Sequence, residues 1–365
     1  MWDTHTPAAI DQRLRAVSFD AELAFVDQVQ SFQPQLDSLV LSYVMRAFES
    51  IDLHCDDLPG FADIEVCRRM LDERGVPCAK FWWLQLLAKI AVTHQCRRCD
   101  VHEMMRELHK SLPFYEIELS LIRRVGEQLP TLFTSEGTST IVQLLFADDV
   151  MSRWYTDGVT YRVFNALACQ AVRFGLDLRQ SEPLRVLEVG AGTGGLTSHL
   201  LKLFDSARTQ YVFTDVGAYF LRSGRRRFAD FPFVQFQVFD LERPGNEQGF
   251  EDDPFDIVIA NNVIHDTRNI AFTLSNITQL MKPRGLFLML ELTDPQIWWH
   301  MCFGSLEGWW RFKTDPDDPR EELMLLKTDE WLDALSLAGF SQTAVLSDQL
   351  RRDFANRLFL SQIER

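Results

Sequence analysis

Apolar residues recur along this chain in two different patterns. Over residues 1–150 they follow helical spacing, clearly in 36–51 (LDSLVLSYVMRAFESI) and 80–92 (KFWWLQLLAKIAV) and more weakly in 100–112. A further long helix is predicted over 153–174. Beyond it, short apolar runs alternate with helical segments. We therefore expect a helical lid subdomain over 1–174, followed by a core of another class over 175–365.

The second half predicts a parallel sheet. Unalternated Val, Ile, Leu and Phe are typical of strands buried on both faces, and the helical segments between such runs provide the crossovers of a doubly wound α/β domain. Five runs have this character: LRVLEVG, QYVFTDV, FVQFQVFD, FDIVIANN and GLFLMLELT. A helix over 328–340 and two more strand candidates, SQTAVLS and RLFLSQI, follow. The chain stops soon after the last one, so we expect this domain to be complete.

Composition narrows the classes of function. The 365 residues are 46% hydrophobic and 24% charged, with a net charge of −15. This charge argues against nucleic acid as the main partner, because phosphate binding needs a basic surface. No apolar run approaches the roughly 20 residues that span a bilayer, and we see no secretion signal at the N-terminus. The basic run 222–228 (RSGRRRF) is interpreted as a solvated helix face rather than as a dock for an acidic partner.

Cysteine usage indicates a reducing compartment. The seven cysteines are an odd number without framework spacing, as in reduced thiols of a cytoplasmic protein. The segment HQCRRCDVH brings together His94, Cys96, Cys99 and His102, which resembles a zinc cluster. Its spacing is too tight for the usual paired ligand loops, in which about a dozen residues or more separate the two pairs. We therefore predict no metal site here.

A glycine-rich turn marks the predicted cofactor site. In LEVGAGTGGLTSHLL (187–201) a strand runs into Gly190, Gly192 and Gly194 and then into a helix. Glycine lets the backbone turn tightly and approach a ligand closely. Asp215 closes the next strand about 20 residues further on, where a carboxylate can accept hydrogen bonds from ribose hydroxyls.

The same turn is compatible with two cofactors. Together with Gly195, its glycines also satisfy GxGxxG, which indicates a dinucleotide. Glu188 just before the turn disfavours a pyrophosphate and suits a cationic cofactor with an amino group, such as S-adenosylmethionine. Asp240 follows the third strand at the carboxyl end of the sheet, where it can meet an adenine amino group. We assign Leu241 beside it, and Asn261 at the end of the fourth strand, to the same S-adenosylmethionine site.

The order of these motifs is similar to that of class I methyltransferases. It runs EVGAGTGG, FTD, FDL, FDIVIANNVIHDT, MKPRG and LELT. More closely, it resembles the C-methyltransferase domains of modular polyketide synthases. Their Asn-x-x-His-x-Thr segment matches NNVIHDTRNI, and their Glu-containing strand end and Trp-rich loop match LELTDP and FGSLEGWWRF. The likeness covers residues 120–365 and is looser before them. It implies a Rossmann-like sheet of seven strands, the last antiparallel, with an N-terminal helical lid.

A histidine and a glutamate are the predicted catalytic pair. His265 comes just past the fourth strand, and Glu291 ends the fifth, so adjacent strands would bring both side chains to one cleft. An imidazole is suited to removing a proton from the carbon between a ketone and a thioester, since its unperturbed pKa is near neutral. A carboxylate on the far ring nitrogen fixes the tautomer and stabilises the imidazolium. The resemblance implies the same dyad.

Two aromatic features are interpreted through the resemblance. Tyr155, in WYTDG, matches a tyrosine that the family places over the active site from the lid, although Gly158 and Val159 stand where the family has Ser-Pro. The segment 297–312 holds four tryptophans, which the resemblance makes a wall of a tunnel for an acyl chain on a phosphopantetheine arm. A buried aromatic cluster is the compatible alternative. His300 within this segment is predicted to be structural.

The sequence thus predicts S-adenosylmethionine-dependent C-methylation of the α-carbon of a β-ketoacyl thioester on acyl carrier protein, in polyketide biosynthesis. An O-methyltransferase of the same pathways, an NAD-dependent oxidoreductase and a non-catalytic scaffold domain are the alternatives. The EGWWRF loop and the NVIHDT segment favour methylation of carbon, and the intact glycines and His–Glu pair argue against a scaffold. We expect the chain to be either a monomer or part of a larger synthase, that is, a partner acting in trans or an excised domain.

Overall fold

The computed structural model describes residues 6–176, 183–250, 254–318, 320, 323–350 and 354–364, and the chain forms two compact units. Unit 1 consists of Met1–Glu22, Tyr155–Asp294 and Arg311–Arg365, and unit 2 consists of Leu23–Trp154 and Pro295–Trp310. Two units were expected, but the expected division had a single boundary at residue 174. In the structure unit 2 takes a second segment from beyond the fifth strand, and unit 1 takes the first helix.

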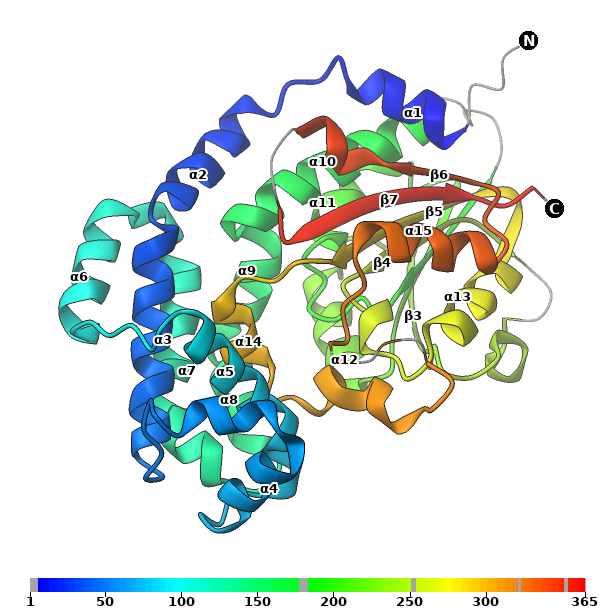
Figure 1. Ribbon diagram of the computed structural model, residues 1–365. Coiled ribbons are helices and arrows are strands. Elements are labelled where there is room, and N and C mark those ends of the chain that lie inside the picture. Colours follow the sequence, from blue (N-terminus) through cyan, green and yellow to red (C-terminus); the bar gives the residue numbers. More distant parts are fainter. Residues whose placement is uncertain are drawn as a thin grey trace. The chain divides into compact units, whose positions relative to one another are not determined.

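Unit 1 is built on a seven-stranded sheet in the order β3-β2-β1-β4-β5-β7-β6 (Figure 1). The first five strands pair in parallel, and β7 runs antiparallel to both β5 and β6. All seven predicted strands and the doubly wound class are thereby confirmed. The strands are β1 (Leu184–Val189), β2 (Thr209–Asp215), β3 (Val234–Val238), β4 (Phe255–Asn261), β5 (Met281–Leu292), β6 (Gln342–Val345) and β7 (Asn356–Gln362).

Helices pack on the sheet because its central strands are apolar on both faces. Leu187, Val258 and Phe287, on β1, β4 and β5, are buried in one cluster with Leu274 of α13 and Trp331 of α15. Full burial of such a side chain contributes about 1.5–3 kcal/mol relative to exposure. The helices of unit 1 are α1 (Pro7–Leu14), α10 (Val159–Leu176), α11 (Thr197–Leu200), α12 (Ala218–Arg227), α13 (Ile270–Gln279) and α15 (Thr328–Leu337), with 3-10 helices η5 (Leu201–Leu203), η6 (Gly245–Gln248), η7 (Ile264–Asp266) and η9 (Leu346–Leu350).

The helix predicted over 153–174 is not continuous. It is divided into α9 (Val150–Asp157) and α10, with Gly158 between them. The side-chain amide of Asn165 donates to the carbonyl oxygens of Tyr155 and Thr156, at 3.0 and 3.1 Å. These bonds satisfy carbonyls that the break removes from helical pairing. The prediction of one helix is therefore wrong, because a side chain from α10 replaces the missing backbone donors.

Unit 2 is helical, as the spacing predicted, and its interior is rich in aromatic rings. Trp154 contacts Trp298, Trp299 and Phe303, with ring centroids 5.4, 5.0 and 5.3 Å away. The helices wholly within it are α3 (Gln33–Glu49), α4 (Ile64–Asp72), α5 (Phe81–Thr93), α6 (Val101–Ser111), α7 (Glu116–Thr134), α8 (Ser139–Phe146) and α14 (Ile297–Phe303), with η1 (Leu58–Ala62), η2 (Cys78–Lys80), η3 (Pro113–Tyr115) and η4 (Ala147–Asp149). The chain passes between the units within α2 (Asp20–Ser31) and α9, after β5, and within η8 (Glu307–Thr314).

Two cysteines of unit 2 are joined. Cys55 and Cys96 form a disulfide with their Cα atoms 6.2 Å apart. The prediction of reduced thiols is therefore wrong for this pair, which lies 41 residues apart in the sequence, too far for spacing to reveal it. Among the helices that the structure describes, none combines the length and apolar character that crossing a bilayer would need.

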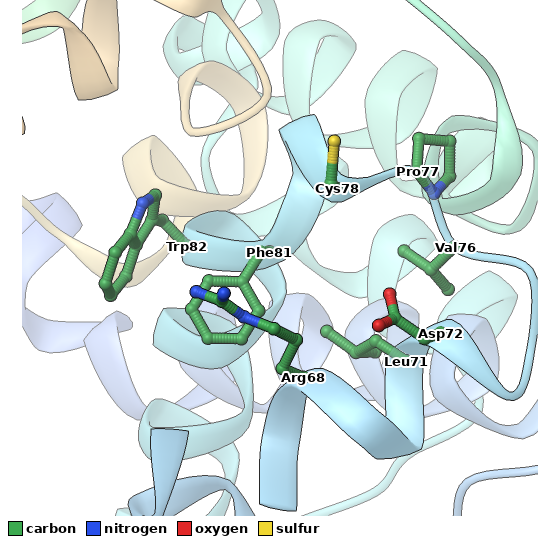
Figure 2. Close-up of a pocket in the computed structure, with 8 residues that line it drawn as sticks. All are labelled: Arg68, Leu71, Asp72, Val76, Pro77, Cys78, Phe81 and Trp82. Atoms are coloured by element: carbon green, nitrogen blue, oxygen red, sulfur yellow. The ribbon is translucent and has the colours of Figure 1, made fainter. Parts of the chain in front are cut away.

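Unit 2 also carries a surface pocket of about 210 Å³ (Figure 2). The Arg68 guanidinium lies over the Phe81 ring, 5.1 Å from its centroid. None of the predicted site residues contributes to this pocket, so it is distinct from the candidate site. Its lining residues are Arg68, Leu71, Asp72, Val76, Pro77, Cys78, Phe81 and Trp82.

Candidate active site

The glycine turn after β1 has a backbone that only glycine adopts easily. Gly190 and Gly192 both have a φ of +56°, and Gly194 has +74°. A Cβ atom at Gly190 would lie 2.2 Å from the side chain of Val263, so this position admits no side chain. A Cβ atom at Gly192 would meet no heavy atom closer than 3.9 Å. The turn therefore has no room for a side chain at Gly190 but leaves open space beside Gly192, where a ligand can approach the backbone closely.

Asp215, at the end of β2, holds this turn. Its two carboxylate oxygens accept hydrogen bonds from the backbone N–H groups of Gly192 and Gly217, at 2.9 and 2.7 Å. Burial raises the pKa of Asp215, and the two backbone hydrogen bonds counteract that rise. A carboxylate has about four acceptor sites, so two bonds leave room for further donors.

Two apolar side chains beside Asp215 were not singled out from the sequence. Val216 follows Asp215 directly and is 68% exposed, and Val238, the partner of Asp215 in the β2–β3 register, is 53% exposed. Large apolar groups left in water at this edge offer a surface for a flat apolar ligand such as an adenine ring. Nothing in the pattern of the strands distinguishes these valines from buried ones.

Glu188 lies inside the sheet and is 1% exposed. One of its carboxylate oxygens accepts hydrogen bonds from the hydroxyls of Tyr211, at 2.6 Å, and Thr197, at 2.7 Å. Burial raises the pKa of Glu188 to about 7, against these hydrogen bonds, and the charge of Asp215 adds to the rise. The carboxylate thus ties β1 to β2 and α11. Its predicted cofactor contact stays a prediction.

The other predicted cofactor residues occupy different environments. Asp240 is half-buried and accepts a hydrogen bond from the backbone N–H of Glu242 at 2.9 Å. Leu241 is buried in the core cluster of the sheet. Asn261 is half-buried at the end of β4, and its side-chain oxygen accepts from the Asn262 amide at 3.1 Å. Asp240 and Asn261 therefore follow β3 and β4 at the edge where Asp215 follows β2.

The predicted catalytic pair is in direct contact. β4 and β5 are parallel neighbours, as expected, and His265 lies on η7 just past β4. Its Nδ1–H donates to Oε2 of Glu291, and the side chains are 7% and 0% exposed. The other carboxylate oxygen of Glu291 accepts from the backbone N–H groups of Ile264, at 2.8 Å, and Val263, at 3.3 Å. Glu291 thus holds both the imidazole and the backbone that carries it, leaving Nε2 as the ring nitrogen able to take a proton.

The charges around His265 favour its protonated form. Burial opposes a positive charge, but the charge and hydrogen bond of Glu291 outweigh burial, so the pKa of His265 is raised. Asp266, whose carboxylate lies 3.9 Å from Nε2, raises this pKa further, whereas Arg320 lowers it. A raised pKa makes the imidazole a stronger proton acceptor.

Tyr155 is linked to the same site by a chain of hydrogen bonds. Its ring centroid is 4.9 Å from that of Tyr161, and the two side chains are hydrogen-bonded. The Asn262 amide donates to the Tyr161 hydroxyl at 2.9 Å, and its oxygen accepts from Asn356 at 3.1 Å. Burial and the charges of Asp266 and Glu291 raise the pKa of Tyr155, so this hydroxyl stays protonated. The sequence indicated Tyr155 but not its partner Tyr161, just past WYTDG, nor Asn356, at the start of β7.

The comparisons with known proteins agree with this geometry. Residues 187–287 match the family described as a methyltransferase domain. A non-reducing polyketide synthase of Penicillium shearii, esdpA, is 27% identical over 93% of this chain, which spans only 16% of that synthase. The matched family segment runs from β1 into β5, so it contains the glycine turn, Asp215 and His265.

Solved structures extend the likeness to the whole chain. The CurJ carbon methyltransferase superposes with a TM-score of 0.83 at 24% identity, covering 99% of this chain and 100% of the other. The DszA carbon methyltransferase superposes with a TM-score of 0.77 at 25% identity, covering 94% and 93%. The chain therefore contains a methyltransferase domain and shares its fold with these two carbon methyltransferases.

Proposed function

We propose that this chain transfers a methyl group from S-adenosylmethionine to the α-carbon of a β-ketoacyl thioester on acyl carrier protein, with His265 as the general base. The observation that carries the proposal is the buried pair of His265 and Glu291 beside the glycine turn. A histidine whose far nitrogen is held by a buried carboxylate is built to move a proton.

The residues at the carboxyl edge fit S-adenosylmethionine. Gly192 leaves open space in the turn, and Asp215 offers free acceptor sites for ribose hydroxyls. Val216 and Val238 offer an apolar surface for the adenine ring. Glu188, with its pKa near 7, would be stabilised in its charged form by a cationic neighbour. When bound, the cofactor supplies a methyl group that is already activated on sulfur.

The chain's own residues create the nucleophile. Nε2 of His265 takes the α-proton, because Nδ1–H is committed to Glu291. Glu291 stabilises the imidazolium that results, as the raised pKa of His265 reflects. Tyr155, protonated and linked to the site through Tyr161, can donate its hydroxyl hydrogen to a substrate carbonyl. Charge developing on that oxygen would strengthen such a bond.

The proposed partner is an acyl carrier protein that presents the thioester on its phosphopantetheine arm, within or beside a larger cytoplasmic synthase. The relative from Penicillium shearii, named a non-reducing polyketide synthase, supports this setting. Removal of an α-proton requires an acidified carbon, and the position between a ketone and a thioester provides one.

The decisive experiment is mass spectrometry of a β-ketoacyl carrier protein after incubation with enzyme and S-adenosylmethionine, with fragmentation to locate the added methyl. A methyl on the α-carbon is expected. A methyl on oxygen would keep the cofactor but replace the reaction with O-methylation. Absence of any mass gain, with cofactor binding intact, would refute the proposed substrate.

A further inference from the structure

A buried arginine follows the Trp-rich segment, in a part of unit 1 to which no motif pointed. The side chains of Arg320 and Asp318 are both 0% exposed, with Nε of Arg320 2.7 Å from the Asp318 carboxylate. A second arginine nitrogen lies 3.0 Å from the other carboxylate oxygen, so the pair is bidentate. The guanidinium also lies over the ring of Phe312, 5.0 Å from its centroid.

The same guanidinium binds the backbone that carries the catalytic histidine. One terminal nitrogen donates to the carbonyl oxygen of His265 at 2.7 Å. The other donates to the carbonyl oxygens of Thr267, at 2.6 Å, and Arg268, at 3.2 Å. A further bond, to the carbonyl of Met324 at 3.1 Å, fixes the arginine to its own segment. The residues on both sides of Asp266 are therefore held by one planar group.

Asp318, the ion-pair partner of Arg320, also bonds this segment of backbone. Its Oδ2 accepts from the backbone N–H of Ile270, the first residue of α13, at 3.2 Å. The neighbouring Asp315 accepts from the Asn269 amide at 3.2 Å. The loop from η7 to α13 is thus bonded at its carbonyls by Arg320 and at the following helix start by Asp318. Such a short, fully bonded loop has little freedom to move its histidine.

We propose that Arg320, itself fixed by Asp318, is a positioning residue that sets the place of His265 for proton removal. Glu291 fixes the imidazole ring from β5, and Arg320, from the segment after η8, fixes the backbone of the same residue. The inference rests on the proposed function, since it gives His265 a proton to remove. A lysine at this position would keep the positive charge, but its compact ammonium group would replace the planar guanidinium that bonds several carbonyls at once.

Arg320 also adjusts the charge of the base. It lowers the pKa of His265, against the raising effects of Glu291 and Asp266. The remaining groups at this site are Arg311, which acts on Asp266, and the protonated hydroxyls of Tyr155 and Tyr161. Loss of the Arg320 charge is therefore expected to move the acid limb of kcat/KM to higher pH, an effect that a purely structural role would not produce.

The test separates proton removal from methyl transfer. Arg320→Lys and Arg320→Gln are compared with wild type and His265→Ala in two assays on a β-ketoacyl thioester. The first is deuterium uptake at the α-carbon without cofactor, above the spontaneous rate; the second is methylation. Both rates are expected to fall about 10- to 100-fold in both Arg320 variants, because a small displacement of a reacting group costs about that much. KM and S-adenosylmethionine affinity should stay within about twofold, as expected for groups that touch neither ligand.

Arg74→Lys is the matched control. Arg74 likewise bonds backbone carbonyls, those of Asp52 and Met70, but in unit 2. It should exchange and methylate as wild type does. The acid limb should move to higher pH in Arg320→Gln and stay in place in Arg320→Lys, which keeps the charge and guards against loss of folding in the Gln variant.

Wild-type exchange and kcat in Arg320→Lys, or an acid limb that stays in place in Arg320→Gln, would overturn the inference. So would a loss confined to thermal stability or to cofactor affinity, which would make the arginine merely structural. If wild type itself neither exchanges nor methylates any β-ketoacyl thioester, the proposed function fails and the positioning role fails with it.

Discussion

The buried carboxylates of Glu188 and Glu291 have different roles because their hydrogen-bond partners differ. Glu188 accepts from two neutral hydroxyls, and burial raises its pKa to about 7. Glu291 is equally buried but faces an imidazole, and there its charge is matched. Environment thus separates two chemically identical groups, one suited to a cationic ligand and the other to a proton-transfer pair.

Removal of the imidazole tests the base directly. His265→Ala should lower kcat by about 100- to 10,000-fold, the range for loss of a general base. Affinity for S-adenosylmethionine, measured by calorimetry, should stay near that of wild type, because the glycine turn and Asp215 are untouched. Loss of cofactor binding would reassign His265 to the cofactor site.

The pH profile follows from the raised pKa of His265. Because the imidazolium persists to higher pH than usual, kcat/KM should rise with pH through a value above the ordinary 6.5. Glu291→Gln removes the main group that raises the pKa of His265, so the acid limb of kcat/KM should move to lower pH while kcat falls. Stopped-flow or discontinuous rates across pH measure both. An acid limb of kcat/KM that stays in place in Glu291→Gln would show that Glu291 does not act on the titrating group.

Asp215 provides the corresponding test of the cofactor edge. Asp215→Ala should weaken S-adenosylmethionine binding by about 1.5–3 kcal/mol, the contribution of hydrogen bonds to a charged group. The variant also frees the turn at Gly192 that this carboxylate holds. Asp230→Ala, at an exposed acidic position in the same unit, is the control and should bind normally. Unchanged affinity in Asp215→Ala would mean that the ribose lies elsewhere.

At the scale of elements, the glycine turn after β1 and the loop after β4 touch each other. Any side chain at Gly190 would collide with Val263, two residues before His265. The glycine turn and the loop that carries His265 therefore pack against each other, so a substitution in one is expected to displace the other.

Gly190→Ala is expected to reduce both cofactor affinity and kcat, and to destabilise unit 1 by about 1–3 kcal/mol through strain at a positive φ alone. Gly339→Ala shares the positive φ in the same unit but meets no atom within 4 Å, so it should cost stability only. Adding Val263→Ala to the Gly190 variant should restore part of kcat. Thermal unfolding and steady-state rates report these effects, and full activity in the single Gly190 variant would contradict the coupling.

Elements that depend on local pattern were predictable, and contacts across the fold were not. The strands could be located because short runs rich in apolar residues mark them, and His265 and Glu291 stand out because they lie just past or at the end of such runs. The break at Gly158 escaped prediction since Asn165, a side chain seven residues on, satisfies the freed carbonyls. Arg320 escaped because its partners lie more than 50 positions earlier in the sequence, where no periodicity connects them.

At the scale of the molecule, each unit has its own core, and only unit 2 has a covalent cross-link among the described residues. Reduction of the Cys55–Cys96 bond should lower the free energy of unfolding of unit 2 by about 2–4 kcal/mol, mainly by releasing the unfolded chain. Calorimetry with and without reductant, with Cys55→Ser as the genetic equivalent, measures the change. The exposed Cys78 provides the control variant Cys78→Ser. A shift in the transition of unit 1 instead would show that the bond acts elsewhere.

The second segment of unit 2 has a consequence for synthesis on the ribosome. Trp154 is made long before Trp298, Trp299 and Phe303, the rings that pack against it. Between those events the ribosome produces all five parallel strands of unit 1. Unit 2, most of which is made before the sheet, is thus completed only after the five parallel strands have been made, so the surface of Trp154 that those rings cover stays exposed during translation. Nascent chains arrested before residue 295 should be the ones that chaperones hold longest.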